Sequence, residues 1–271
     1  MDLSIPALPS SCDVGVIGAG AAGLAAAIFT RRLNPSLSVV LLDSATKPGA
    51  KILVSGGGRC NVTNAAVSEA DFWGGRRTMI RRVLRAFQPD DTVEFFRELG
   101  VTLHEEANGK LFPDSNRARD VLDALLGEVH AVGAMLFSGH RVLSVSRDSD
   151  GFRVTTSRGD LRARVVVLAT GGQSLPKSGS DGTGFAIGRG LGHTLVPTTP
   201  GLVPLLIEPA KGAALDIHAT RLRGQRPRLV DVADFGALRA PVRVAHHSRP
   251  PVDDGILAER GRARLIPRAG V

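Results

Sequence analysis

Residues 13–23 read DVGVIGAGAAG, and this stretch decides the fold of the chain. The β-branched run at residues 14–17 suits a buried parallel strand, and the alanine-rich residues 21–33 suit a helix. A glycine-rich turn joins the two without an intervening loop. The order of strand, turn and helix predicts the opening of a Rossmann-like βαβ unit.

Each glycine of the turn has a separate physical reason. Gly18 permits the tight turn, Gly20 lets the backbone approach a pyrophosphate, and Gly23 lets the helix pack close to the strand. The helix start at Ala21 and Ala22 presents free N–H groups and the positive end of the helix dipole to an anion. The turn therefore predicts a phosphate site, although a ligand-free packing turn remains the alternative at this point.

An acidic residue follows at the distance that a dinucleotide site requires. Residues 38–42 are predicted to form the second strand, and Asp43 at its end lies about 20 residues beyond Gly23, where a carboxylate can bind both ribose hydroxyls. A membrane span is not expected at residues 13–29, because glycines interrupt this apolar stretch and Asp13 precedes it. The whole arrangement predicts a dinucleotide-binding domain.

A second glycine cluster indicates which dinucleotide is bound. Residues 51–64 read KILVSGGGRCNVTN, and this stretch closely resembles the signature of bacterial NAD(P)/FAD-dependent oxidoreductases known as BaiN-like or aminoacetone-oxidase-like flavoproteins. Further stretches similar to that family are GKLFP at 109–113 with the helix 118–126, LATGG at 168–172, and GH at 192–193 leading to LVPL at 202–205. The resemblance covers about residues 12–207.

The resemblance implies FAD, with its ADP half on the first glycine turn and its isoalloxazine ring near the second cluster. Arg59 is expected to place a positive charge near the ring, where it would stabilise the reduced, anionic flavin. An ordinary solvated loop is the alternative for Arg59 and Lys51, and a strand-terminating turn is the alternative for residues 170–172. The candidate cofactor residues are Gly18, Gly20, Ala21, Ala22, Gly23, Asp43, Lys51, Ser55, Gly56, Gly57, Gly58, Arg59, Cys60, Asn61, Thr170, Gly171 and Gly172.

The resemblance also implies an activity. The expected function is a flavoprotein oxidoreductase that exchanges hydride or electrons between NAD(P)H or a small substrate and an acceptor through FAD. No residue stands out as a catalytic acid or base. One alternative is a non-catalytic remnant that binds FAD or a dinucleotide without turnover. A classical NAD-dependent dehydrogenase is a third possibility, but it leaves the second glycine cluster unexplained.

The remaining pattern predicts an α/β fold with a parallel sheet, a small antiparallel β insertion and an irregular C-terminal tail. An FAD-binding domain is expected at 1–207, with helical and β insertions within 65–165. In the helix predicted at 91–99, Asp90 is expected to be the N-cap and Gly100 to end the helix. Helices are predicted at 69–87, 91–99 and 118–132, and an antiparallel unit is predicted from strands at 134–138, 141–147, 152–157 and 162–168, with a hairpin turn at 148–151.

The last third of the chain has a different composition. Periodicity fades after residue 207, and arginines recur in runs such as RLRGQRPR at 221–228. We expect residues 208–271 to be an atypical tail of a truncated family member, out of frame from near residues 207–215, or disordered. A genuine but divergent tail is the alternative.

Composition limits the partners and the compartment. The net charge of +8 is weak support for nucleic acid, because about a third of the basic residues lie in the tail and no aromatic residues are interleaved with its arginines. We expect a small-molecule substrate or acceptor, no nucleic acid, no membrane and no metal. Cys12 and Cys60 provide no disulfide framework, which suits a reducing cytoplasm, and a redox role for Cys60 is not favoured. His104 and His193 are expected to be structural or surface residues.

Overall fold

The computed structural model describes residues 7–72, 75–173 and 178–198. Nearly all of them belong to one compact unit, Met1–Leu195, and the second unit is Val196–Val271. The predicted tail at 208–271, the family-like stretch at 202–205 and part of the predicted helix at 69–87 lie outside the described residues. The fold below is that of the first unit.

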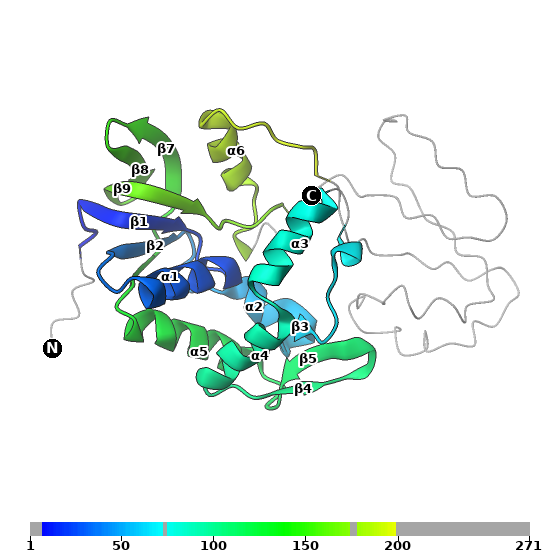
Figure 1. The fold of residues 1–271 in the computed structure, drawn as a ribbon. Coiled ribbons are helices and arrows are strands. Elements are labelled where there is room, and N and C mark those ends of the chain that lie inside the picture. Colours follow the sequence, from blue (N-terminus) through cyan, green and yellow to red (C-terminus); the bar gives the residue numbers. More distant parts are fainter. Residues whose placement is uncertain (1–6, 73–74, 174–177, 199–271) are drawn as a thin grey trace, which may run out of the picture. The chain divides into compact units, whose positions relative to one another are not determined.

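A six-stranded sheet carries the fold (Figure 1). The strand order is β6-β2-β1-β9-β8-β7, and β6, β2, β1 and β9 run parallel whereas β9, β8 and β7 form an antiparallel meander. In the central register Val16 lies opposite Leu41 of β2 and Val167 of β9. The strands are β1 Ser11–Ile17, β2 Val39–Asp43, β6 Met135–Ser138, β7 Val142–Asp148, β8 Gly151–Thr156 and β9 Gly159–Leu168. The predicted α/β class is confirmed.

One strand lies in a different place from the prediction. Residues 134–138 were expected in the antiparallel unit, but β6 is a parallel strand beside β2, with Leu41 opposite Leu136. The reason is the helix before it, α5 (Ala118–Ala131), which returns the chain across the sheet as parallel strands require. The hairpin turn at 148–151 is confirmed, because Asp148 pairs with Gly151.

Two apolar layers hold the sheet, because its side chains alternate between faces. Helices α1 (Ala21–Leu33) and α5 cover one face, where Leu24 and Leu122 are fully buried against strand residues such as Val16. Figure 1 shows these two helices on the same side of β1 and β2. On the other face, Val40 and Phe137 pack with the meander and with α6 (Thr183–Gly190).

The segment between β2 and α5 forms a smaller layer with its own antiparallel sheet, in the order β3-β5-β4. The sequence did not predict this sheet, because its strands are too short to show alternation. Its elements are α2 Ala50–Val54, a 3₁₀ turn Ser55–Gly58, β3 Thr63–Asn64, a 3₁₀ turn Glu69–Asp71, α3 Arg77–Ala86, α4 Pro89–Glu98, β4 Leu103–Glu105, a 3₁₀ turn Ala107–Gly109 and β5 Lys110–Pro113.

Two helix boundaries in this layer correct the predictions. The single helix expected at 69–87 is a 3₁₀ turn and the separate helix α3. Asp90 is not the N-cap of α4, because Pro89 occupies the first helical position and Gln88 precedes it. The backbone N–H of Gln88 donates to Asp91 Oδ2 at 2.7 Å. Gly100 follows the helix with φ +79°, as a helix-ending glycine requires.

Candidate cofactor site

A cavity of about 750 Å³ opens where the parallel strands end. Ile17 of β1, Asp43 of β2 and Leu168 of β9 are all carboxyl-end residues, and all three line it. Ligands of open α/β sheets bind at this edge. The predicted cofactor residues that line the cavity are Gly18, Gly20, Ala21, Ala22, Asp43, Lys51, Ser55, Cys60, Asn61, Thr170 and Gly171.

The three glycines of the first turn differ in their surroundings: close packing requires two of them, and the third faces open space. Gly18 has φ +103°, and a Cβ built there would lie 2.5 Å from the carbonyl oxygen of Ala169. A Cβ on Gly23 would lie 1.8 Å from the carbonyl oxygen of Gly18, which explains why this glycine does not line the cavity but permits close helix packing. A Cβ on Gly20 would meet no atom within 4 Å. Gly20 therefore leaves backbone accessible on the cavity side.

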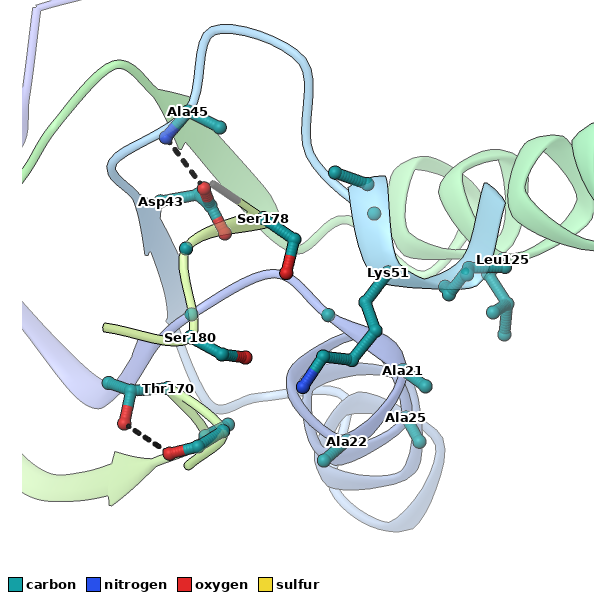
Figure 2. Close-up of a pocket in the computed structure, with 18 of the residues that line it drawn as sticks. Ala21, Ala22, Ala25, Asp43, Ala45, Lys51, Leu125, Thr170, Ser178 and Ser180 are labelled. Carbon is teal, nitrogen blue, oxygen red and sulfur yellow. Dashed lines mark hydrogen bonds between the residues drawn. The ribbon is translucent and has the colours of Figure 1, made fainter. Parts of the chain in front are cut away.

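The N-terminus of α1 faces the same cavity. Gly20 is its N-cap residue and provides no side-chain hydrogen bond, and Ala21 and Ala22 of the first turn line the cavity. Figure 2 shows Ala21, Ala22 and Ala25 along one side of the helix. An uncapped helix start combines open N–H donors with the positive end of the dipole, which is the arrangement that binds phosphate.

The Asp43 side chain is held by backbone N–H groups of two segments, the first glycine turn and the loop that follows β2. Its Oδ2 accepts a hydrogen bond from Ala19 N–H at 2.6 Å. Its Oδ1 accepts one from Ala45 N–H at 2.8 Å, which Figure 2 shows. A carboxylate has about four acceptor positions, so two remain for ribose hydroxyls. The fixed orientation makes Asp43 a preorganised acceptor beside the glycine turn.

Polar groups from three other segments reach the cavity. Lys51 extends from α2 between α1 and the loop that carries Ser178 and Ser180 (Figure 2). The Lys51 ammonium nitrogen lies 3.8 Å from where a Cβ on Gly171 would be. Thr170 donates from its hydroxyl to the carbonyl oxygen of Gly171 at 3.3 Å. The turn that follows β9 and the second signature therefore meet in space, as the family resemblance implies.

The second glycine cluster does not itself line the cavity. Gly56, Gly57 and Gly58 have φ values of +54°, +70° and +90°, which residues with a side chain rarely adopt. A Cβ on Gly56 would lie 2.7 Å from the backbone nitrogen of Asn61 and 2.7 Å from Phe112. These glycines shape the turn, and the residues that follow it, Cys60 and Asn61, reach the cavity. Gly172 also lies outside the cavity lining.

Arg59 corrects a prediction. It does not line the cavity, and its guanidinium donates from Nη1 and Nη2 to the two carboxylate oxygens of Glu106, at 2.5 and 3.2 Å. The guanidinium carbon lies 4.0 Å from the centre of the Phe112 ring. The hydrogen bond from Arg59 lowers the pKa of Glu106, so the carboxylate stays charged and offsets the cation. Arg59 anchors the turn to the small sheet, and it does not offer a free positive charge to a flavin in this arrangement.

Both cysteines are free and buried. Burial raises the pKa of the Cys12 thiol to about 12, and burial also raises the pKa of Cys60. Cys60 lines the cavity with φ +65°. A raised pKa leaves little thiolate near neutral pH, and the thiolate is the reactive form of the side chain.

The sequence did not identify a further part of the cavity wall, which residues 140–142, 178–181 and 183 line. Arg141 bridges to Asp181, with Nη2 and Oδ2 at 2.7 Å. Hydrogen bonds from the hydroxyl and the N–H of Thr183, together with Arg141, lower the pKa of Asp181 to about 2. His140 is buried, with Nδ1 3.0 Å from the Ser138 carbonyl oxygen. Asp181 and Thr183 follow soon after the LATGG turn in the sequence, so that turn was the signal that could have pointed to these two residues.

A second part of the cavity wall, also not predicted, is apolar. It comes from α1, α4 and α5, and its residues are Ala25, Phe29, Phe95, Phe96, Val121 and Leu125. Phe29 and Phe95 have ring centres 5.0 Å apart. The cavity thus joins a polar, glycine-rich end to an aromatic wall.

The described residues contain no cluster of His, Cys, Asp or Glu suited to a metal ion. In the same part of the chain, no helix has the length and apolar character needed to cross a membrane. His104 lies outside the cavity, with Nδ1 3.3 Å from Asp114 Oδ1 and Nε2 3.7 Å from Glu106 Oε1.

Comparison with known proteins gives one family. The family described as the HI0933-like protein Rossmann domain matches residues 12–208. The chain is 34% identical over 227 residues to the 3-dehydro-bile acid delta(4,6)-reductase of Clostridium scindens, covering 82% of this chain and 55% of that protein. It is 33% identical over 195 residues to the ribosomal RNA dihydrouridine synthase of Escherichia coli, covering 72% and 48%.

Among solved structures, FrdA of Escherichia coli quinol fumarate reductase aligns with a TM-score of 0.48 and 19% identity, over 60% of this chain and 33% of that one. The chain spans about half the length of the curated relatives it matches. The family match covers both glycine signatures and the LATGG turn. The chain therefore belongs to the HI0933-like family, and the part that matches is the FAD-binding Rossmann domain of that family, as its signatures predicted.

Proposed function

We propose that this cavity binds FAD, with the ADP half against the first glycine turn and the flavin toward Lys51 and Asn61. The observation that carries the proposal is the meeting of an uncapped helix start, a fixed acceptor at Asp43 and an open backbone position at Gly20 in one cavity. The space beside Gly20 fits a pyrophosphate that approaches the backbone closely.

The residues of the chain would bind and orient the cofactor. The first turn of α1 holds the pyrophosphate through N–H groups, and Asp43 holds the ribose. Lys51, Ser55 and Asn61 supply polar contacts nearer the ring, and Thr170 and Gly171 lie opposite them. Bound FAD would supply hydride transfer, which protein side chains cannot perform alone. We also propose that the FAD-binding domain spans residues 1–207 and that residues 208–271 form a separate tail.

We propose that the reaction is reduction of a carbon–carbon double bond, with NAD(P)H as electron donor. The names of the two curated relatives support this class, because a delta(4,6)-reductase and a dihydrouridine synthase both saturate such a bond. The aromatic wall of the cavity suits a flat ring, which Phe29, Phe95 and Phe96 can contact. A cytoplasmic location agrees with two free cysteines.

The first test is an absorbance spectrum of the purified full chain after incubation with FAD and desalting. Bands near about 375 and 450 nm belong to the flavin itself and would mark retained cofactor. Anaerobic addition of NADPH or NADH should then bleach the longer-wavelength band. Retained colour without bleaching would favour the non-catalytic FAD-binding remnant, and a colourless protein would refute the proposed site.

A further inference from the structure

The helix α3 and the residue before it carry a dense positive charge. Five arginines, Arg76, Arg77, Arg81, Arg82 and Arg85, lie between Asp71 and Asp90, and this interval contains no acidic residue and no lysine. None of the helix residues is buried. A surface that gathers this much charge of one sign attracts polyanions.

The surrounding structure neutralises little of this charge. Arg81 pairs with Glu69, and the charge of Arg77 also helps to lower the pKa of Glu69. Within the described residues, Arg76, Arg82 and Arg85 form no ion pair. Arginines elsewhere in the unit are often paired. Examples are Arg32 with Glu98, Arg59 with Glu106 and Arg141 with Asp181.

Four of the five arginines, all but the N-cap residue Arg76, share one side of the helix. Arg77, Arg81 and Arg85 recur at every fourth position and form a row of about 12 Å, because a helix rises about 1.5 Å per residue. Arg82 lies beside this row, and the apolar residues fall on the opposite side. Of these, Ile80 and Leu84 are partly buried, whereas Met79 and Val83 are 61% and 63% exposed.

The helix also ends at the cavity. Phe87 directly follows α3, lines the cavity and stacks edge-on against Phe29 with ring centres 5.3 Å apart. Phe87 is 41% exposed, and Phe72 before the helix is 47% exposed. Two exposed aromatic rings therefore flank the arginine row, one of them at the cavity wall.

We propose that α3 is a docking surface for single-stranded RNA, whose phosphates contact the arginine row while an adjacent base reaches the cavity beyond Phe87. The inference rests on the proposed function, because the cavity is where the base would be reduced. It differs from the sequence-based expectation of no nucleic acid, which considered the arginines of the tail and not those of α3.

Two features favour RNA over an anionic membrane as the partner. All the cations are arginine, whose planar guanidinium binds phosphate in a bidentate manner and stacks on bases. Exposed phenylalanines at both ends provide the stacking surfaces that single strands use.

The test is fluorescence anisotropy of a labelled, uridine-containing single-stranded RNA of about 16 nucleotides, with the FAD-incubated full chain, at about 50 to 200 mM salt. The test variant is Arg77→Gln/Arg82→Gln/Arg85→Gln. The control is Arg147→Gln/Arg158→Gln/Arg189→Gln, which removes the same charge from exposed positions outside α3. Both keep the tail unchanged.

We expect the α3 variant to lose at least about tenfold in affinity, and the slope of log K against log salt to become shallower by about 2, because each lost phosphate contact contributes about 0.7. The control should change affinity less than about threefold. Equal losses in the two variants, or wild-type binding to vesicles of phosphatidylserine and phosphatidylcholine without binding to RNA, would overturn the proposal.

Failure of the proposed function is distinguishable from failure of the docking surface. Flavin absorbance reports whether the cavity holds FAD, and anisotropy reports whether α3 holds RNA. A colourless chain that still discriminates the two variants would refute the FAD site alone. A yellow chain that binds no RNA would refute the docking surface alone. Circular dichroism of both variants checks that the fold is kept.

Discussion

Three glycine-to-alanine substitutions separate packing from cofactor binding. Gly23 and Gly127 both lie inside helices, α1 and α5, so alanine should add about 1 kcal/mol of helix propensity at either position. Their surroundings differ. A Cβ at Gly127 meets nothing within 4 Å, whereas a Cβ at Gly23 lies 1.8 Å from the Gly18 carbonyl oxygen.

The obstacle at Gly23 is backbone, so no side chain can rotate away from it. The helix must shift from β1, and overpacking of this kind costs about 1 to 3 kcal/mol or more. We expect Gly23→Ala to lower the free energy of unfolding by about 2 kcal/mol and Gly127→Ala to raise it by up to about 1 kcal/mol. For a chain of this size, the first change corresponds to a Tm lower by about 4 to 8 °C.

Gly20→Ala completes the series. Its Cβ meets no protein atom within 4 Å, and the backbone is extended with φ −81°, so alanine should cost less than about 1 kcal/mol of stability. FAD affinity should fall at least about tenfold, because the methyl group occupies the space of the pyrophosphate.

Urea denaturation and FAD titration of the three variants measure both quantities. The reasoning is refuted if Gly23→Ala is as stable as Gly127→Ala. It is also refuted if Gly20→Ala binds FAD as the wild type does.

Further predictions follow from single residues. Asp43→Ala should lower stability by about 1 to 3 kcal/mol, because the N–H groups of Ala19 and Ala45 lose their acceptor, and should weaken FAD binding in a titration. The pKa of Asp181 falls from 3.8 to about 2 in the folded chain, so its stabilisation is present above pH 4 and lost as the pH falls through about 2. Urea unfolding of Asp181→Asn should show a deficit of about 1 kcal/mol at pH 7 that shrinks below pH 4; a deficit independent of pH would contradict this assignment. Iodoacetamide at pH 8 should alkylate Cys60 more slowly than it alkylates the amino acid cysteine in solution, because burial raises the pKa of Cys60. Mass spectrometry measures this rate, and alkylation of Cys60 as fast as that of the amino acid would contradict the prediction.

The sequence predicted the elements whose signals are long or chemically specific. Helix α1 occupies the predicted residues Ala21–Leu33, because a run of alanines begins directly after the glycine turn. The parallel core was predicted because β-branched residues persist in β1 and β2. By contrast, β3 has two residues and β4 three, too few for any periodic pattern. Thr63 of β3 pairs with Leu111 of β5, 48 positions later in the chain, whereas β4 pairs with β5 locally, with Glu105 opposite Leu111.

The part of the cavity wall at residues 140–142, 178–181 and 183 was not predicted for a related reason. His140, Arg141 and Asp181 belong to connections that follow β6 and β9, and sequence spacing does not reveal that these connections meet. The Arg141–Asp181 ion pair joins them over 40 positions. Motif spacing finds residues on one turn, but it does not find pairs that the sheet order brings together.

Arg59 shows how a correct signature can support an incorrect role. The charge was predicted from type and neighbourhood, since a guanidinium among glycines suits a flavin. Glu106, 47 positions away, takes that guanidinium, and Phe112 lies beneath it. The turn itself has a backbone that only glycine adopts easily at Gly56, Gly57 and Gly58. Contacts outside such a turn fix its conformation, and the ion pair between Arg59 and Glu106 is one of these contacts. The signature therefore places Cys60 and Asn61 at the cavity through an anchor on its outer side, and of Lys51 and Arg59 only Lys51 lines the cavity.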